Sequence, residues 1–409
     1  MGLVGGISSG ARAIPDLDGV PFRVARSLGP HVWDDQGRQY IDCAMGFGAT
    51  MLGHAPASVL DAVREALADG PMPAFPQRRE EAAGEALARL TAPLTEVIFV
   101  NSGSEAVHLA CRAARAVTGR RVIAKIAAGY DGWYDPMLLG TAQSADARLE
   151  GPRPVRDGVT LLRWNDLEDA HRLFAEHSDI AAVLIEPVLA NAGCLVAGDG
   201  YLAALGHLAR AHGALVISDE VLMGFRLTCG LSAPQLGLVP DLAAVGKAIG
   251  SGFAVAALVG TPDAMAPFST GQLARQGTYN GNPVASAAVL ATVTGLESVD
   301  FAALLRRGDR LARRLRNAFE RVGQSVVTSG FGSVFSLWRG DEPPVLYRDA
   351  VARHDNDFAT AVHCALRRQG VVSMAVPMGR FFLSDAHDAT VCEQLGAAFE
   401  AAAQGAGIR

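Results

Sequence analysis

The chain has 409 residues, half of them apolar, and a net charge of -6 from 36 basic and 42 acidic residues. A chain of this size can bury one large core and a smaller one. Its mild acidity gives no basis for a nucleic-acid partner, and its longest apolar runs are too short to span a bilayer. No secretory signal is visible, and six scattered cysteines are typical of a reducing compartment, so we expect a cytoplasmic protein without a metal site or a membrane partner.

Apolar segments and helical patterns alternate through the middle of the chain. Strands are predicted at residues 97–100, 122–126, 159–162, 181–185, 214–218, 242–245 and 256–259, with helices at 105–117 and 201–212. This alternation predicts an α/β fold in which a mostly parallel central sheet has helices on both faces.

The pattern changes toward the C-terminus. Long helices are predicted at residues 283–297 and 301–322, an antiparallel strand at 332–338, and helices at 358–368 and 388–402. We therefore expect a large domain over residues 50–290 and a smaller α+β domain built from residues 1–49 and 291–409.

Two charged residues each follow an apolar strand. Asp219 ends the strand at 214–218, and Lys247 follows the strand at 242–245. The carboxyl ends of parallel strands meet at the edge of the sheet where ligands bind. Pyridoxal phosphate (PLP) requires a lysine for its aldehyde and an acidic partner for its ring nitrogen, and these two residues are candidates for both roles. The alternative for Asp219 is a solvated turn.

Three loops add weaker signals. Residues 101–106 join a strand to a helix and are small enough for a phosphate to approach the backbone, although an ordinary N-cap has the same pattern. Residues 128–133 carry an aromatic residue that either stacks on a flat cofactor or packs in the core. Residues 277–283 form either an anion-binding turn or a plain helix cap. No Gly-x-Gly-x-x-Gly turn follows the first strand, which disfavours a nucleotide-dependent oxidoreductase.

In this order the segments resemble the class III PLP-dependent aminotransferases of fold type I, in particular enzymes similar to glutamate-1-semialdehyde 2,1-aminomutase. The resemblance extends over about residues 21–402. It includes residues 37–42, 52–54, 101–106, 130–132, 186–187, 219–226, 246–247, 277–283 and 384–387.

The resemblance implies a role for each matching residue. Lys247 would form the Schiff base with the cofactor (the internal aldimine) and move the proton, and Asp219 would pair with the pyridine nitrogen. Tyr130 and Val221 would pack on opposite ring faces. Glu186 would lie near the ring hydroxyl.

The resemblance also implies a phosphate site shared between two subunits. Gly103 and Ser104 would hold the phosphate, and Ser102 can add a hydroxyl donor. Thr278 would reach the phosphate of the partner subunit, so the enzyme would be a homodimer with shared active sites.

Departures from the family pattern concern the substrate. Asp131 stands where a histidine usually follows the stacking aromatic residue, and Phe47 stands where the aminomutase has a tryptophan near its substrate. Arg23 matches an aminomutase arginine that holds the substrate carboxylate. A surface or interdomain ion pair is the alternative for this arginine.

Arg380 falls where related aminotransferases carry a carboxylate-binding arginine. Their resting partner for that arginine is a glutamate, and Asn191 stands in its place near the substrate, so we expect Arg380 to be free. A structural ion pair is the alternative for Arg380 as well. The gating glutamate of the aminomutase would fall near Gly379 and is missing.

The resemblance therefore implies amino transfer from a small-molecule donor to an aldehyde or ketone acceptor by a ping-pong mechanism. An aminomutase or a racemase would use the same cofactor and share the first proton abstraction. A catalytically silent PLP-binding regulatory relative is a more distant alternative, which the presence of both Lys247 and Asp219 disfavours. The sequence does not identify the donor or the acceptor.

Overall fold

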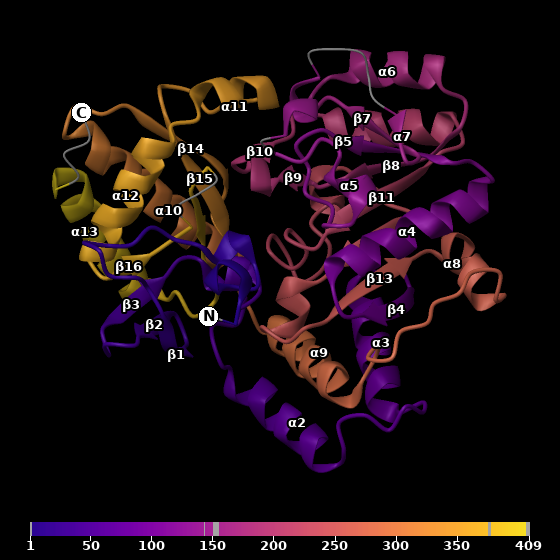
Figure 1. Ribbon diagram of the computed structural model, residues 1–409, viewed down its shortest axis with the longest axis horizontal. Helices are drawn as coiled ribbons and strands as arrows, with labels where there is room; N and C mark the ends of the chain where they lie inside the picture. Colours follow the sequence, from indigo (N-terminus) through magenta and orange to yellow (C-terminus); the bar gives the residue numbers. More distant parts are fainter. Residues whose placement is uncertain (1, 143, 150–154, 375–377, 406–409) are drawn as a thin grey trace.

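The larger part of the molecule is built around one eight-stranded sheet. The computed structural model describes residues 2–142, 144–149, 155–374 and 378–405. Figure 1 shows two lobes, the larger around this sheet and the smaller holding the C-terminal helices and the N-terminal strands. The sheet order is β4-β13-β12-β11-β8-β5-β7-β6.

The strands of this sheet agree with the sequence pattern. They are β4 (Glu96–Val100), β5 (Val122–Ile126), β6 (Val155–Arg156), β7 (Val159–Leu162), β8 (Ile180–Ile185), β11 (Leu215–Glu220), β12 (Leu242–Val245) and β13 (Ala256–Gly260). The central strands β12, β11, β8, β5 and β7 pair in parallel, whereas β13 runs antiparallel to both of its neighbours. All seven predicted strands are present, and the predicted α/β fold with a mostly parallel sheet is confirmed.

Helices cover both faces of the sheet. They are α3 (Arg78–Leu90), α4 (Gly103–Thr118), α5 (Asp135–Leu138), α6 (Leu167–Glu176), α7 (Tyr201–Ala211), α8 (Pro262–Ser269) and α9 (Pro283–Leu296), and α2 (Ala57–Ala68) packs on α9. Successive strand residues point to opposite faces, so Leu184 packs in the apolar cluster with α4 and α8, and Val183 packs in the cluster with α6 and α7. This two-sided cover explains why strands such as β8 are apolar throughout.

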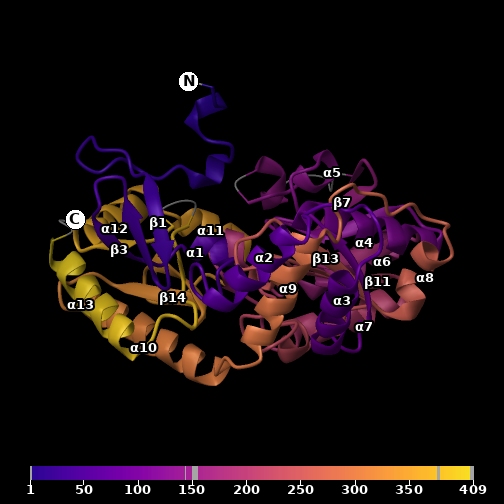
Figure 2. The ribbon, with the colours of Figure 1, turned by 90° about the horizontal axis from the view of Figure 1, so that it is seen from below.

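The smaller lobe joins the two ends of the chain. One sheet contains β1 (Val24–Leu28), β2 (His31–Asp34), β3 (Gln39–Asp42) and β16 (Val371–Val372), and a second contains β14 (Val326–Phe331), β15 (Val334–Arg339) and β17 (Arg380–Phe382). The helices of this lobe are α1 (Met45–Gly48), α10 (Phe301–Glu320), α11 (Tyr347–Arg353), α12 (Asn356–Arg368) and α13 (Ala389–Gly405). A short hairpin, β9 (Val188–Leu189) and β10 (Leu195–Val196), follows β8. Figure 2 shows β1 and β3 beside α12 and the first residues extending away from the body.

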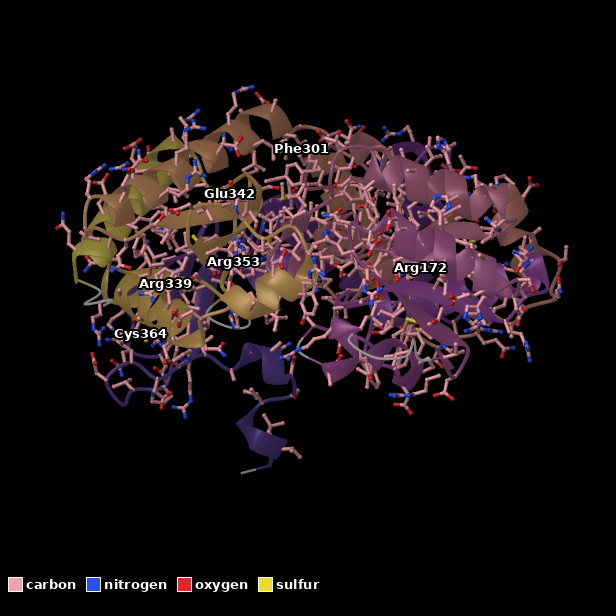
Figure 3. All side chains as sticks on the ribbon, turned by 90° about the horizontal axis from the view of Figure 1, so that it is seen from above. Arg172, Phe301, Arg339, Glu342, Arg353 and Cys364 are labelled. Carbon is pink, nitrogen blue, oxygen red and sulfur yellow. The ribbon has the colours of Figure 1, made fainter. Side chains whose placement is uncertain are left out.

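An apolar core runs across both lobes. Phe99 and Val245 of the large sheet belong to the same buried cluster as Phe301, Leu315 and Phe399 of the C-terminal helices. Side chains fill the space between the lobes, and Phe301 lies near the upper edge of the molecule, between the two lobes, in Figure 3. The division at residues 50–290 stays a prediction, and residues 1 and 406–409 of the predicted small domain lie outside the described residues.

Among the described residues, no single helix has the length and apolar character needed to cross a membrane. Only α9 and α10 taken together meet that test, and a bend of 79° separates them.

Candidate active site

A cavity of about 320 Å³ lies where β8, β11 and β12 end and α4 begins. Of the residues predicted to form the site, nine line this cavity: Ser102, Gly103, Ser104, Tyr130, Glu186, Asn191, Asp219, Val221 and Lys247. Strand ends and helix starts from four separate segments converge here, as expected for the ligand edge of an open α/β sheet.

The start of α4 forms one wall. Ser102 is the N-cap: its Oγ accepts from Glu105 N (3.4 Å) and donates to Glu105 Oε2 (2.9 Å), which also accepts from Asn101 N (2.9 Å). This capping box fixes the first turn, whose leading amides have no partner within the helix and can bind an anion. A Cβ added at Gly103 would lie 2.8 Å from a methyl carbon of Val221, so the backbone approaches Val221 as only glycine allows.

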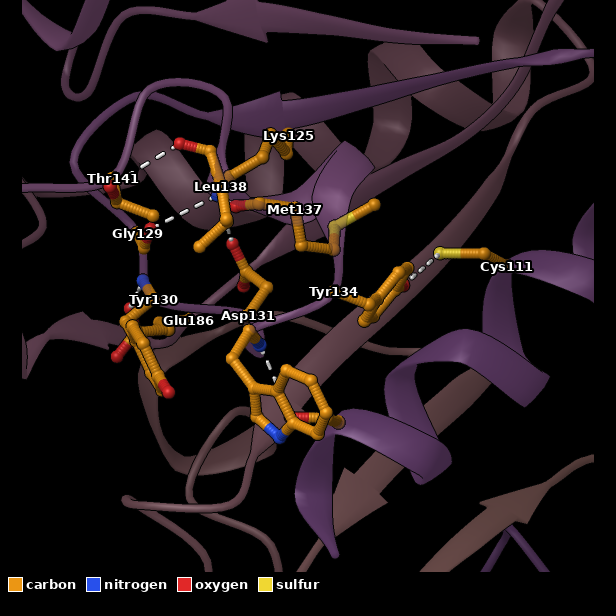
Figure 4. Close-up of polar contacts among 12 residues, drawn as sticks. Cys111, Lys125, Gly129, Tyr130, Asp131, Tyr134, Met137, Leu138, Thr141 and Glu186 are labelled. Carbon is orange, nitrogen blue, oxygen red and sulfur yellow. Dashed lines mark hydrogen bonds and ion pairs between the residues drawn. The ribbon is translucent and has the colours of Figure 1, made fainter. Parts of the chain in front are cut away.

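The loop after β5 forms the opposite wall. Tyr130 N donates to Glu186 Oε1 (2.8 Å), and the Tyr130 side chain remains 44% exposed at the cavity. Gly132 has a φ of +113°, and a Cβ there would lie 2.9 Å from Ser104 Oγ, which accepts from Trp133 N (3.3 Å). The loop is therefore fastened to Glu186 on one side and to the start of α4 on the other (Figure 4).

Two buried carboxyl groups lie at the floor of the cavity. Burial raises the pKa of Asp219 to about 8, and the charge of Asp131 adds to this rise, while the hydrogen bond from Val221 N (2.9 Å) opposes it. Burial also raises the pKa of Glu186 well above its usual value, with further contributions from Asp131 and Asp219. Ionisation of either carboxyl group thus requires a nearby cation.

Lys247 lies two residues after the end of β12 and adopts a φ of +42°. Burial lowers the pKa of Lys247 to about 8, although the charges of Asp219 and Glu186 act in the opposite direction. An amine with this pKa is partly neutral near pH 7.5 and is therefore able to attack a carbonyl carbon.

Comparison with known proteins places this arrangement in a family. Residues 15–336 match the family model described as Aminotransferase class-III. The chain belongs to the class III aminotransferases.

The proteins similar to this chain include both aminomutases and transaminases. Over 98% of its length this class III aminotransferase is 37% identical to a glutamate-1-semialdehyde 2,1-aminomutase of Deinococcus radiodurans, covering 93% of that protein. An omega-transaminase from Sphaerobacter thermophilus superposes with a TM-score of 0.86 at 31% identity, covering 96% of this chain and 92% of the other. A transaminase with PLP bound superposes with a TM-score of 0.84 at 26% identity and the same coverage. The fold is therefore fold type I of the PLP-dependent transferases.

Arg380 lies beside the cavity but does not line it. It is 5% exposed, and its Nη1 donates to Asn191 Oδ1 (2.6 Å) and to Ala190 O (3.1 Å). The expectation that Asn191 leaves this arginine free is therefore wrong, because an amide oxygen accepts from a guanidinium much as a carboxylate does. Asn191 brings no negative charge, however, and Arg380 Nε has no hydrogen-bond partner among the described residues.

Three further predicted residues lie outside the cavity. Arg23 is exposed and lies 3.9 Å from Asp35, the surface ion pair that was its alternative interpretation. Phe47 packs against a cluster that includes Met45. Thr278 is exposed and lines a separate groove together with residues 72–77. The structure thus does not bring these side chains to the Lys247 cavity of their own chain.

Sequence reasoning missed some residues of the site. Residues 252–255 line the cavity but follow no recognisable motif, because tertiary packing alone brings them there. Lys125 was also missed, although a charge within the apolar β5 strand was a visible signal. Asp131, predicted to matter for the substrate, instead lies beneath the cavity lining and pairs with Lys125 at 2.9 Å.

Proposed function

We propose that this protein is a PLP-dependent aminotransferase that moves an amino group from a small-molecule amine to an aldehyde or ketone in a ping-pong cycle. The observation that carries the proposal is the convergence of Lys247 and Asp219 in one cavity, each with a pKa shifted to about 8. The bound cofactor would supply an aldehyde that captures the donor nitrogen and a ring that accepts electrons from the donor carbon.

The shape of the cavity supports this cofactor. The free amides at the start of α4, with Gly103 and Ser104, suit its phosphate, and Tyr130 and Val221 stand on walls that suit its ring faces. Among the similar solved structures, one transaminase has PLP bound.

The charges of the site also support it. Burial raises the pKa values of Asp219 and Glu186, and the negative charge of Asp131 adds to both shifts. A protonated ring nitrogen beside Asp219 would supply the missing cation and lower the pKa of that carboxyl group. Lys247, which lies after the carboxyl end of β12 and lines the cavity, then supplies the Nζ that is able to carry the proton to and from the donor carbon.

Arg380 supports a substrate with a carboxylate. It is a buried guanidinium whose only side-chain partner among the described residues is the neutral Asn191, so a carboxylate entering the cavity would neutralise its charge. Movement of Asn191, which lines the cavity, would expose Arg380 to the substrate.

An aminomutase is the second candidate. It is favoured by the 37% identity to an enzyme of that name, and it would use the same lysine and aspartate. Gly379 stands where the gating acid of the aminomutase would fall, which favours amino transfer between two molecules.

We also propose a cytoplasmic homodimer in which Thr278 completes the partner's phosphate site. Thr278 is exposed and lies outside the cavity of its own chain, next to the exposed side chains of Phe75 and Tyr279. A second copy of the chain would cover these apolar groups.

A spectral screen tests the proposed reaction. Purified enzyme loaded with PLP would be mixed with single amines, and absorbance would report conversion of the cofactor from its aldehyde to its amino form. We expect an amino-acid donor to convert it and to release one equivalent of carbonyl product. Isomerisation of an amino aldehyde without such release would identify the aminomutase, and failure of every amine class to convert the cofactor would contradict both.

A further inference from the structure

A buried ion pair lies directly beneath the candidate active site. Lys125 Nζ lies 2.9 Å from Asp131 Oδ2 and donates to Gly129 O (3.1 Å) and Met137 O (2.9 Å) (Figure 4). Lys125 is fully buried and Asp131 is 1% exposed. Two carbonyl oxygens of the loop thus accept hydrogen bonds from the ammonium group, and Asp131 faces it as an ion pair, so the lysine closes the loop that follows its own strand.

Asp131 stands between two contacts that shape the cavity. The residue before it, Tyr130, donates its backbone N–H to Glu186, and the residue after it, Gly132, packs against Ser104. A side chain anchored below the loop thus sets the position of the two neighbours that form the wall above.

The pair also lies within electrostatic reach of the floor of the cavity. A Cβ added at Gly129 would lie 3.0 Å from Asp131 Oδ2 and 3.6 Å from Glu186 Oε1, so both carboxylates flank one backbone position. The charge of Asp131 contributes to the raised pKa values of Glu186 and Asp219. A change in the charge of either partner of the pair would therefore be felt at the cavity.

The composition of the chain gives independent support. Of its 36 basic residues only two are lysines, Lys125 and Lys247, and every other basic position is an arginine. A planar guanidinium fork is longer than an ammonium group and does not fit three acceptors around one point in a closed site. The chain thus uses lysine only in the candidate active site and directly beneath it.

We propose that Lys125 and Asp131 are a positioning pair for the active site. Their ion pair holds residues 129–134, so that Tyr130 and the contact of Gly132 with Ser104 are in place before a ligand binds. This inference rests on the proposed function, because the loop is positioned for the ligand of that site. The order of residues 129–134 is nevertheless measurable without the cofactor.

Amide hydrogen exchange tests the positioning role directly. Removing one partner of a buried pair leaves an unpaired buried charge, so Lys125→Met and Asp131→Asn should each speed exchange at residues 129–134 by about tenfold or more, with or without PLP. Arg121→Met is the matched control, because Arg121 precedes the same strand and its ion pair with Asp179 is on the surface. It should leave the loop unchanged. Normal exchange in both Lys125→Met and Asp131→Asn would overturn the proposal.

The pH dependence of the bound cofactor's visible absorbance separates positioning from general stability. Asp131→Asn leaves the cation of Lys125 unpaired and should lower the midpoint pH of the absorbance change by about one pH unit. Lys125→Met leaves the anion of Asp131 unpaired and should raise that midpoint pH. Shifts of the same sign in both variants would overturn the proposed link to the site. If Lys125→Met does not fold, Asp131→Glu decides: it should retain the wild-type midpoint and loop exchange, and behaviour like that of Asp131→Asn would overturn the proposal. Absence of cofactor absorbance in the wild type would count against the proposed function instead.

Discussion

The two lysines of this chain lie in contrasting surroundings, each with an aspartate nearby. Lys125 contacts Asp131 and two carbonyl oxygens in a closed, fully buried group. Lys247 and Asp219, in contrast, share no hydrogen bond or ion pair within the described part of the chain, and both line an open cavity. The pKa of Lys247 is lowered and that of Asp219 is raised, which brings both toward their neutral forms. A charge with partners organises the fold, whereas a charge without them is available to a ligand.

Removal of Lys247 should have the largest effect on turnover. Lys247→Ala should lower kcat by about 10³-fold or more, since the same side chain is the proposed nucleophile and general base. Steady-state assays with the best donor would measure this loss. Lys247→Arg keeps the positive charge without a primary amine and should be equally slow. Near wild-type turnover in either variant would remove Lys247 from the chemistry.

Replacement of Asp219 should lower the rate and raise the stability of the cofactor-free protein. Asp219→Asn should lower kcat by about 10²-fold, the cost of removing one preorganised electrostatic partner. The folded-state pKa of Asp219 is raised from 3.8 to about 8, so the folded protein holds a proton that the unfolded chain releases between these values. The contribution of Asp219 to stability is therefore lost as pH rises from about 4 to 8.

The pH dependence of unfolding checks the sign of that effect. Denaturant titrations of the cofactor-free proteins at pH 5 and pH 8 should show that the advantage of Asp219→Asn over the wild type grows with pH. An advantage that shrinks toward pH 8 would show that Asp219 is ionised and paired in the folded protein.

Replacement of Arg380 tests whether the buried guanidinium beside the cavity binds the carboxylate of the substrate. Arg380→Ala should slow the half-reaction with an amino-acid donor by about ten- to a hundredfold, because a charge-assisted hydrogen bond is lost, and should hardly affect a carboxylate-free amine. Single-turnover absorbance measurements with both donors would check this. Asn191→Ala is the companion variant, and it should leave the arginine available and the amino-acid reaction active. Equal slowing of both donors by Arg380→Ala would assign Arg380 a structural role.

Thr278 should give the smallest effect. Thr278→Ala should weaken PLP retention by about tenfold, the loss expected for one hydrogen bond to a charged group. Mixed dimers of Thr278→Ala with Lys247→Ala protomers would carry both lesions in one site and leave the other intact. Recovery of wild-type retention in half of the sites would show that Thr278 acts across the interface, and no recovery in exchanged dimers would place its action within its own chain.

Sequence reasoning succeeded where a residue's position follows from strand geometry. Asp219 and Lys247 were predicted together because parallel strands present their carboxyl ends at one edge. It failed where contacts depend on tertiary packing: the partner of Arg380 was misjudged, and nothing in the sequence showed that Lys125 would meet Asp131. Helix α3 and the strands β1–β3 were not predicted; α3 packs mainly against α9, which is distant from it in the sequence, so its stability comes from tertiary packing.

The central claim is that Lys247, not Lys125, is the amine that meets the cofactor aldehyde. Borohydride reduction of the PLP-loaded enzyme would trap that link, and peptide mass mapping would locate it unambiguously, since the chain has no other lysine. The account predicts a single modified peptide containing Lys247, with Lys125 unmodified in its closed group. Modification of Lys125, or a PLP-loaded enzyme that retains two unmodified lysines after reduction, would contradict it.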